Sequence, residues 1–142
     1  MKYVILVSHG KFADGLANAL GMLAGQRKDL LSCGLEDGKS ADEFAEAFKD
    51  VISNVNTDDE ILLLGDLIGG SPLTTACNVI NEKGLTEQTR VIGGMNLPLA
   101  LTALLMKDAM SLDDAKDGVL SEAQGALKEF LLAVEDDEDE EV

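Results

Sequence analysis

Short apolar runs alternate with longer segments of helical periodicity along this chain. The runs lie at about residues 2–7, 30–34, 61–65 and 89–92, and each is followed by a segment with apolar residues at helical spacing. This alternation is typical of βα units, which build a parallel sheet covered by helices. A length of 142 residues suits one hydrophobic core. The sequence therefore predicts a single α/β domain.

Start and stop residues mark the expected helices. Ser40 and Glu43 have the spacing of a capping box. Ser71 is expected to be the N-cap of the following helix, with Pro72 at its first position and Gly84 at its end. Helices are also expected at 97–106 and 112–134, while the first helix is expected to bury one face, formed by Leu16, Ala19, Leu20 and Leu23.

Charge separates the chain into a body and a tail. The net charge is -16, and every residue from 135 to 141 is acidic. Such a run repels itself, so we expect one folded domain at 1–134 and a disordered acidic tail at 135–142. An acidic chain with one tyrosine and no tryptophan lacks the positive charge and stacking residues that hold nucleic acid. Nucleic acid and anionic membranes are not expected partners.

The lengths of the apolar runs bear on the cellular location of the protein, and the spacing of its cysteines bears on metal binding. The apolar run before Ser8 is too short for a secretory signal, and the run around 97–106 is too short to span a bilayer. We therefore expect a cytoplasmic protein. Cys33 and Cys77 have neither metal-site spacing nor the number needed for a disulfide framework, so both are expected to be small buried apolar residues.

The only histidine, His9, directly follows the first predicted strand, and Asp66 directly follows the third. If these strands are parallel neighbours, both side chains reach the crevice where open α/β sheets bind ligands. An aspartate bound to one imidazole nitrogen fixes the tautomer, stabilises the cation formed during attack and leaves the other nitrogen as a nucleophile. His9 and Asp66 are thus the candidate catalytic residues.

Small residues beside this pair favour binding of a phosphoryl group. Gly69, Gly70 and Ser71 open a predicted helix, where backbone N–H groups, a hydroxyl and the helix dipole suit an anion. Gly10 precedes a second helix start. We expect these four residues to form a phosphate cradle next to His9.

Three other chemistries fit the sequence less well. A serine hydrolase built from Ser71, His9 and Asp66 would lack the G-x-S-x-G elbow, because Leu73 replaces its second glycine. The Walker A pattern for direct ATP chemistry is missing. A receiver domain with Asp66 as phosphoacceptor would need an acidic magnesium cluster where Ser8 and His9 stand.

Three blocks resemble the mannose-type enzyme IIA component of the bacterial phosphoenolpyruvate-dependent sugar phosphotransferase system. They are residues 5–10 (ILVSHG), 65–72 (GDLIGGSP) and 91–98 (VIGGMNLP), and the match covers about the first 106 residues. The resemblance implies a doubly wound sheet of strand order 2-1-3-4, with a fifth antiparallel strand exchanged in a homodimer. That strand is not located by the sequence pattern and would lie after Met106 or be absent.

The same resemblance implies a phosphocarrier. His9 would accept a phosphoryl group at Nε2 from HPr and pass it to a histidine of the IIB subunit, with no metal or cofactor. Asp66 would hold Nδ1, and Ser71 with nearby N–H groups would hold the phosphoryl oxygens. Association with the membrane would be indirect, through the IIC and IID permease subunits. Leu67 and Ile68 depart from the hydroxyl and aromatic residues common in the family.

Two alternatives stay open at this point. The phosphoryl-donor subunit of dihydroxyacetone kinase also begins with a strand ending in Ser-His, although its second block differs from residues 69–72. A non-enzymatic regulatory module of the same fold is the other alternative, against which the presence of both His9 and Asp66 argues. The sequence does not identify a sugar, nor does it separate uptake from regulation.

Overall fold

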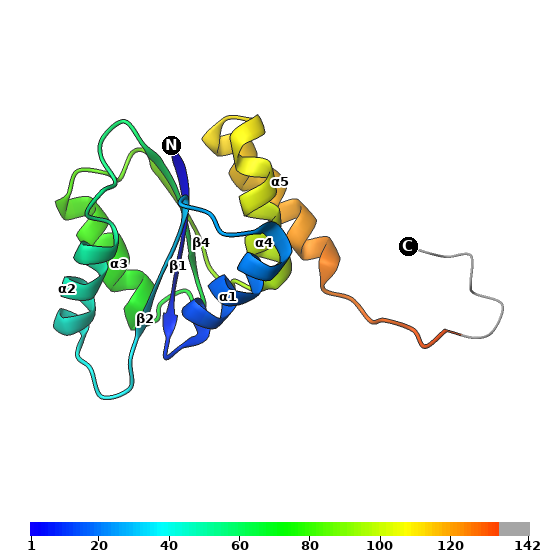
Figure 1. The fold of residues 1–142 in the computed structure, drawn as a ribbon, viewed down its shortest axis with the longest axis horizontal. Coiled ribbons are helices and arrows are strands. Elements are labelled where there is room, and N and C mark those ends of the chain that lie inside the picture. Colours follow the sequence, from blue (N-terminus) through cyan, green and yellow to red (C-terminus); the bar gives the residue numbers. More distant parts are fainter. Residues whose placement is uncertain (134–142) are drawn as a thin grey trace.

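The computed structural model describes residues 1–133 and contains one parallel sheet (Figure 1). The order of its strands is β2-β1-β3-β4. The predicted α/β class and the order implied by the resemblance are therefore confirmed. The four strands are β1 (Lys2–His9), β2 (Leu30–Leu35), β3 (Glu60–Gly65) and β4 (Thr89–Ile92).

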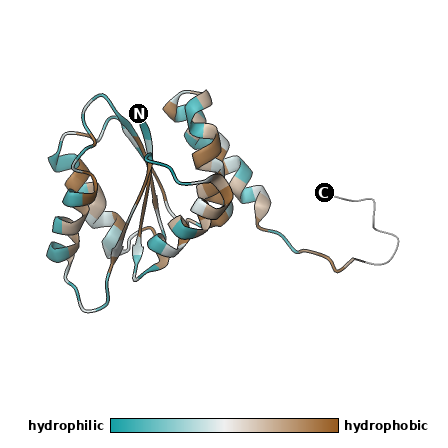
Figure 2. Ribbon diagram, viewed as in Figure 1, coloured by the Kyte–Doolittle hydropathy of each residue, from teal (hydrophilic) through white to brown (hydrophobic). Residues whose placement is uncertain are grey.

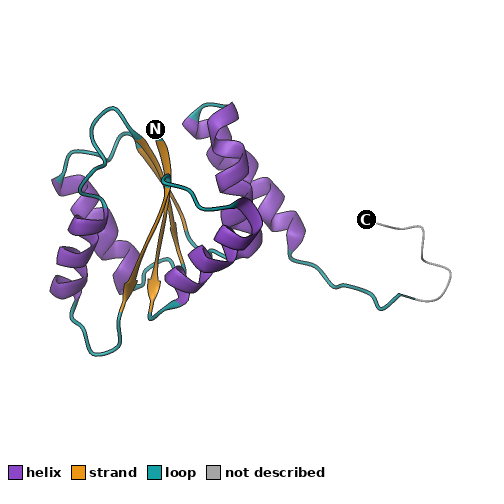
Figure 3. Cartoon of the chain, in the orientation of Figure 1, coloured by secondary structure: helices purple, strands orange, loops and turns teal. Residues whose placement is uncertain are grey.

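Helices cover both faces of the sheet (Figure 3). One layer consists of α2 and α3, and the other consists of α1, α4 and α5. A short 3-10 helix, η1, links α4 to α5. The helices are α1 (Phe12–Ala24), α2 (Ala41–Val51), α3 (Ser71–Glu82), α4 (Leu97–Met106), η1 (Lys107–Ala109) and α5 (Leu112–Ala126).

Side chains of β1, one of the two inner strands, alternate between the two helical layers. Val4 and Leu6 pack toward α1, α4 and α5, whereas Tyr3, Ile5 and Val7 pack toward α2 and α3. Successive residues of a strand point to opposite faces, so a continuous apolar run fills both cores. The apolar strands and inner helix surfaces are visible at the centre of Figure 2.

Helix capping agrees with the sequence at one position and differs at another. Ser40 Oγ accepts a 3.1 Å hydrogen bond from the Glu43 N–H, and Glu43 Oε1 accepts a 2.9 Å bond from the Ser40 N–H, so the capping box is confirmed. In α3, by contrast, extended Gly70 is the N-cap and Ser71 is already the first helical residue. The expected N-cap was wrong by one residue, because the chain turns helical directly after Gly70.

Two expected features of the helices are wrong. Leu23 is 59% exposed, because the buried stripe of α1 runs through Leu16 and Leu20 to Ala24. The last helix ends at Ala126 instead of continuing to 134. Leu127 already has extended backbone, and the apolar side chains after it are exposed, so no packing supports further helix there.

The C-terminal expectations are only partly covered by the described residues. The predicted tail at 135–142, like the end of the predicted 1–134 domain, lies outside residues 1–133. Between Met106 and residue 133 the structure has η1, α5 and irregular chain, so a fifth strand does not form in that part of the single chain.

Both cysteines in the described residues are free thiols. Cys33 is buried, and burial raises its pKa to about 11. Cys77 is only partly buried, so the expectation of two buried cysteines is correct for Cys33 alone. Residues 1–133 contain no group of three potential metal ligands, and none of their helices has the length and apolarity needed to cross a membrane.

Candidate functional site

His9 and Asp66 meet at the carboxyl edge of the sheet. Strands β1 and β3 are hydrogen-bonded neighbours, with Val7 opposite Gly65. His9 is therefore the last residue of one strand and Asp66 directly follows the other. The imidazole Nδ1 lies 2.8 Å from Asp66 Oδ2. The sequence prediction that these two residues lie together is thus correct in its geometry.

Asp66 is held in place by three hydrogen bonds. Besides the ring contact, its Oδ2 accepts a 2.9 Å bond from the His9 N–H, and its Oδ1 accepts a 2.9 Å bond from the Leu67 N–H. Burial raises the pKa of the Asp66 carboxyl, but the hydrogen bonds from the backbone and ring of His9 outweigh that effect and the pKa lies below its ordinary value. Asp66 is an anion at neutral pH.

This arrangement selects one tautomer of His9. An ionised carboxylate can only accept hydrogen bonds, so Nδ1 carries the hydrogen and Nε2 keeps its lone pair. The His9 side chain is 49% exposed, whereas that of Asp66 is 14% exposed. The largely covered carboxylate therefore orients a ring whose other edge is open to a reacting group.

Ser8 fixes the turn that carries His9, a role that was missed in the sequence. Its buried Oγ accepts a 2.7 Å hydrogen bond from the Ala13 N–H and donates a 3.0 Å bond to the His9 carbonyl. The available signal was a serine shortly before a helix start, where side-chain oxygens often accept from backbone N–H groups.

Gly10 holds the same turn against β2. It has φ of +56° and donates a 2.7 Å hydrogen bond to the Leu35 carbonyl. A β-carbon on Gly34 would lie 2.1 Å from the Gly10 carbonyl oxygen, so only glycine at position 34 permits this approach. Gly10, expected to contact phosphate, thus has a clear structural role in the turn.

The β3–α3 loop brings the start of α3 to the imidazole. Gly69 has φ of +85°, which glycine adopts readily. A β-carbon on Gly70 would lie 3.0 Å from His9 Cε1, so the backbone comes close to the ring. Ser71 follows as the exposed first residue of α3. Three of the predicted cradle residues, Gly69, Gly70 and Ser71, therefore lie on the turn beside His9, at the positive end of a 12-residue helix.

The sequence has counterparts among known proteins. The sequence profile of the family described as "PTS system fructose IIA component" matches residues 3–120. The chain belongs to this EIIA family. Membership assigns it a role in the sugar phosphotransferase system (PTS).

Several named EIIA proteins are similar to this family member. It is 26% identical over 121 residues to the fructose-specific EIIA component of Bacillus subtilis (strain 168), covering 85% of this chain and 81% of that protein. It is 29% identical over 114 residues to the sorbose-specific EIIA component of Klebsiella pneumoniae, covering 80% and 81%. It is 25% identical to the mannose-specific EIIAB component of Escherichia coli (strain K12), but the match covers 82% of this chain and only 38% of that longer protein.

Solved EIIA structures share the fold. The EIIA component from Streptococcus agalactiae superposes with a TM-score of 0.79 and 26% identity, covering 91% of this chain and 97% of that one. The mannose/sorbose-specific IIA subunit from Enterococcus faecalis has a TM-score of 0.77 and 25% identity, covering 94% and 98%. The doubly wound sheet of this EIIA protein is thus the fold of solved EIIA components.

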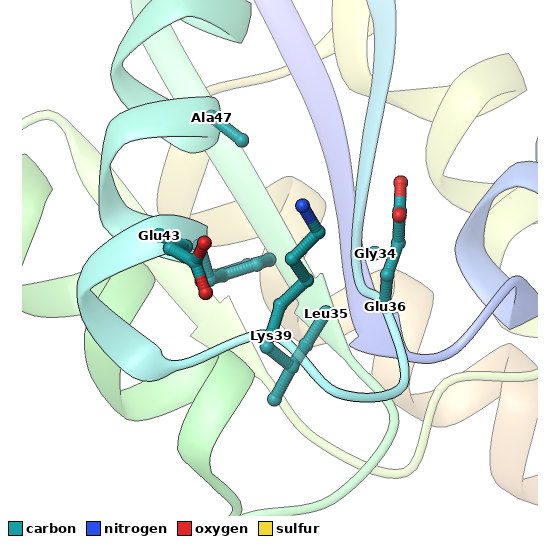
Figure 4. A pocket seen from close by; sticks show the side chains of 7 residues that line it. Gly34, Leu35, Glu36, Lys39, Glu43 and Ala47 are labelled. Atoms are coloured by element: carbon teal, nitrogen blue, oxygen red, sulfur yellow. The ribbon is translucent and has the colours of Figure 1, made fainter.

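Exposed apolar side chains flank the His9–Asp66 pair of this EIIA protein, and a small cavity lies at the neighbouring strand β2. Phe12, Leu67 and Ile68, which flank the pair in sequence, are 47%, 58% and 82% exposed. The cavity, of about 160 Å³, lies between β2 and the start of α2 (Figure 4). Leu35, which lines this cavity, pairs with His9 in the strand register.

Proposed function

We propose that this EIIA protein is a phosphocarrier in which His9 accepts a phosphoryl group from the phosphohistidine of HPr and passes it to a histidine of IIB. The observation that carries the proposal is the 2.8 Å contact between His9 Nδ1 and Asp66. This contact leaves Nε2 as the available nucleophile on a half-exposed ring.

In the proposed transfer, the Nε2 lone pair attacks the phosphorus atom held by HPr. A bond between Nε2 and phosphorus forms as the bond to the donor nitrogen breaks, and the electron pair of the broken bond returns to the donor imidazole. The negative charge of Asp66 stabilises the positive charge that develops on His9. The same steps toward a IIB histidine release the phosphoryl group, and neither direction requires a metal or cofactor.

The start of α3 would receive the phosphoryl oxygens. Gly69 and Gly70 expose backbone there, Ser71 adds a hydroxyl, and Gly10 lies on the facing turn. Backbone N–H groups and the positive end of a helix dipole stabilise phosphate charge. Phosphoryl transfer depends mainly on such positioning and charge stabilisation, so a small rigid site is sufficient.

The wider setting of the proposal follows from the family. The Escherichia coli relative is described as an EIIAB component, which supports a IIB unit as the next acceptor. We place the protein in the cytoplasm as a homodimer, associated with the membrane only through IIC and IID permease subunits. The named relatives are specific for fructose, mannose or sorbose. The proposed site contacts only protein-bound phosphate, so the permease would select the sugar.

Mixing the purified protein with phosphoenolpyruvate, enzyme I and HPr tests the proposal. Intact mass should increase by one phosphate per chain, the adduct should be labile in acid, and omission of HPr should prevent it. Addition of IIB should then remove the phosphate. Absence of an adduct while phospho-HPr is demonstrably present would overturn the proposal.

A further inference from the structure

Ile68 is unusual among the residues around His9. Its side chain is 82% exposed, yet it lies directly over Gly93, the first residue after β4. A β-carbon on Gly93 would lie 2.1 Å from Ile68 Cγ1 and 2.8 Å from Cδ1. The isoleucine therefore occupies the space that any other residue at position 93 would need.

A backbone hydrogen bond joins the same two loops at a second point. The Met95 N–H donates a 2.9 Å bond to the Gly65 carbonyl. The β4–α4 loop thus contacts the end of β3 at Gly65 and the β3–α3 loop at Ile68. Asp66, which binds His9, lies between these two contacts.

We propose that Ile68 and Gly93 are positioning residues, which brace the β3–α3 loop so that Asp66 and the start of α3 stay aligned with His9. The inference deepens the proposed phosphocarrier function and rests on it. The proposed role requires no contact with the reacting nitrogen. Both residues act through the loop, and the contact makes the geometry of the His9 site depend on the β4–α4 loop.

The rest of the loop explains why a brace is needed. Leu67 is 58% exposed and Gly69 has φ of +85°, so the segment has little buried side-chain surface and one highly flexible residue type. Small displacements of a positioning group strongly reduce the rate of a reaction that depends on alignment. A side chain packed on the backbone of a neighbouring loop limits such displacements.

The spacing at this contact permits a compensating pair of substitutions. In Gly93→Ala the new methyl group collides with Ile68 Cγ1 and Cδ1, which must move or displace the loop. In Gly93→Ala/Ile68→Ala those two atoms are absent, and the nearest remaining atom, the β-carbon at position 68, lies 3.4 Å away. The φ of Gly93 is not in the left-handed region, so alanine adds no backbone strain there.

Two variants provide matched controls. Gly125→Ala introduces the same change on α5, where no heavy atom lies within 4 Å of the added β-carbon. Met22→Ala truncates a side chain that is 83% exposed near the end of α1, similar in exposure to Ile68. Both should behave as wild type in every measurement below.

The first measurement is the ¹⁵N NMR spectrum of the imidazole in the free protein, near neutral pH. His9 is the only histidine, so its two ring nitrogens report the tautomer directly. We expect the ratio of the Nδ1–H to the Nε2–H tautomer to fall on the order of tenfold in Gly93→Ala, the size of effect that a charge-assisted hydrogen bond produces. The double variant should recover most of this ratio.

The second measurement is the rate of phosphoryl transfer from phospho-HPr. Gly93→Ala should be slower by about tenfold to a hundredfold, as expected for a misplaced positioning group, and the double variant should be faster than Gly93→Ala. A wild-type ring spectrum in Gly93→Ala or in Ile68→Ala would overturn the inference, because either substitution disrupts the contact. So would a defect in Gly93→Ala that Ile68→Ala does not relieve.

The two measurements separate this inference from the proposed function. The NMR spectrum needs no phosphate, so it tests the brace even if HPr fails to label the wild-type protein. Far-UV circular dichroism identifies any variant that does not fold. If Gly93→Ala alone does not fold, Ile68→Ala and the double variant remain, and a wild-type tautomer ratio in Ile68→Ala overturns the inference.

Discussion

Pairs of oppositely charged groups lie at both ends of the parallel strands, the carboxyl edge and the amino edge of the sheet, and the two differ in exposure. At the carboxyl edge, Asp66 binds one nitrogen of a half-exposed imidazole. At the amino edge, Lys107 is only 1% exposed, and its ammonium lies 2.7 Å from Asp29 Oδ2 and 2.9 Å from Asp108 Oδ1. The first pair leaves one imidazole nitrogen available, whereas the ammonium of Lys107 is enclosed by its contacts within the chain.

The amino-edge network connects distant parts of the chain. Arg27 makes two 2.9 Å hydrogen bonds to the Asp29 carboxylate, and Lys2 Nζ donates to the carbonyls of Lys107 and Met110. The α1–β2 loop, the start of β1 and η1 are thereby joined. In physical terms, removing one member of such a network leaves a buried charge without its partner, which is costly.

The two pairs differ in exposure and in whether one partner keeps an unused lone pair, and these two properties distinguish the proposed reactive pair from the structural one. Both edges contain an aspartate whose pKa lies below its ordinary value because of hydrogen bonds from neighbouring donors. A lowered aspartate pKa is therefore no sign of reactivity here. The difference lies in the partner, which at His9 keeps a second nitrogen for chemistry.

The largest effect is expected from His9→Ala. Removal of the nucleophile should abolish phosphate incorporation, while the free energy of unfolding should change by only about 0.5 kcal/mol, because the His9 side chain is 49% exposed. Intact mass after incubation with phospho-HPr and urea unfolding measure the two quantities. A labelled alanine variant would show that the phosphate is carried elsewhere.

Lys107→Met should produce the opposite result. Its 1% exposed ammonium balances Asp29 and Asp108, so the substitution should lower the free energy of unfolding by about 3 kcal/mol. Phosphate labelling at 25 °C should persist in the folded fraction. The matched control is Lys116→Met at a partly exposed ion pair with Asp117, where we expect a change of about 0.5 kcal/mol or less. Equal effects of both substitutions would contradict a structural role for the buried network.

Asp66→Asn should separate positioning from charge at the carboxyl edge. The amide is similar in shape but cannot stabilise a cationic ring as an anion does, so transfer should slow by about tenfold to a hundredfold. Rapid-quench measurement of labelling by phospho-HPr gives the rate. Asp108→Asn, a substitution at the other edge, serves as the control and should leave the rate unchanged. Wild-type kinetics in Asp66→Asn would remove this residue from the mechanism.

The smallest expected effect concerns acid stability. Hydrogen bonds from Arg27, together with Lys107, hold the pKa of Asp29 far below its usual range despite burial. A lowered folded-state pKa gives stabilisation that is fully present above the unfolded pKa of about 4 and is lost as the pH falls through the folded value. The free energy of unfolding, measured in urea, should therefore decrease below about pH 4, and less steeply in Asp29→Asn. An unchanged slope in this variant would show that other carboxylates dominate.

Much of the fold follows from local sequence signals. The four apolar runs became four strands within one or two residues, because a strand buried on both faces must be apolar throughout. The meeting of His9 with Asp66 also followed, because parallel neighbouring strands end at the same edge. The capping box of α2 is a similar short-range signal.

The missed features depend on contacts between distant residues. Lys107 and Asp29 are far apart in sequence, and no local pattern identifies a buried ammonium. The packing of Ile68 on Gly93 depends on the relative position of two loops. The end of α5 at Ala126 depends on where tertiary packing stops, since the apolar pattern itself continues to Leu132.

The sheet also divides the interior into two compartments. Phe48 lies in one and Leu104 in the other, and the inner strands β1 and β3 contribute alternate residues to both. Substitutions at separated sites with no shared partners have nearly additive effects. Sequence drift in one helical layer is therefore tolerated without matching changes in the other. Two largely independent compartments help explain how proteins sharing 26% identity retain one backbone arrangement with a TM-score of 0.79.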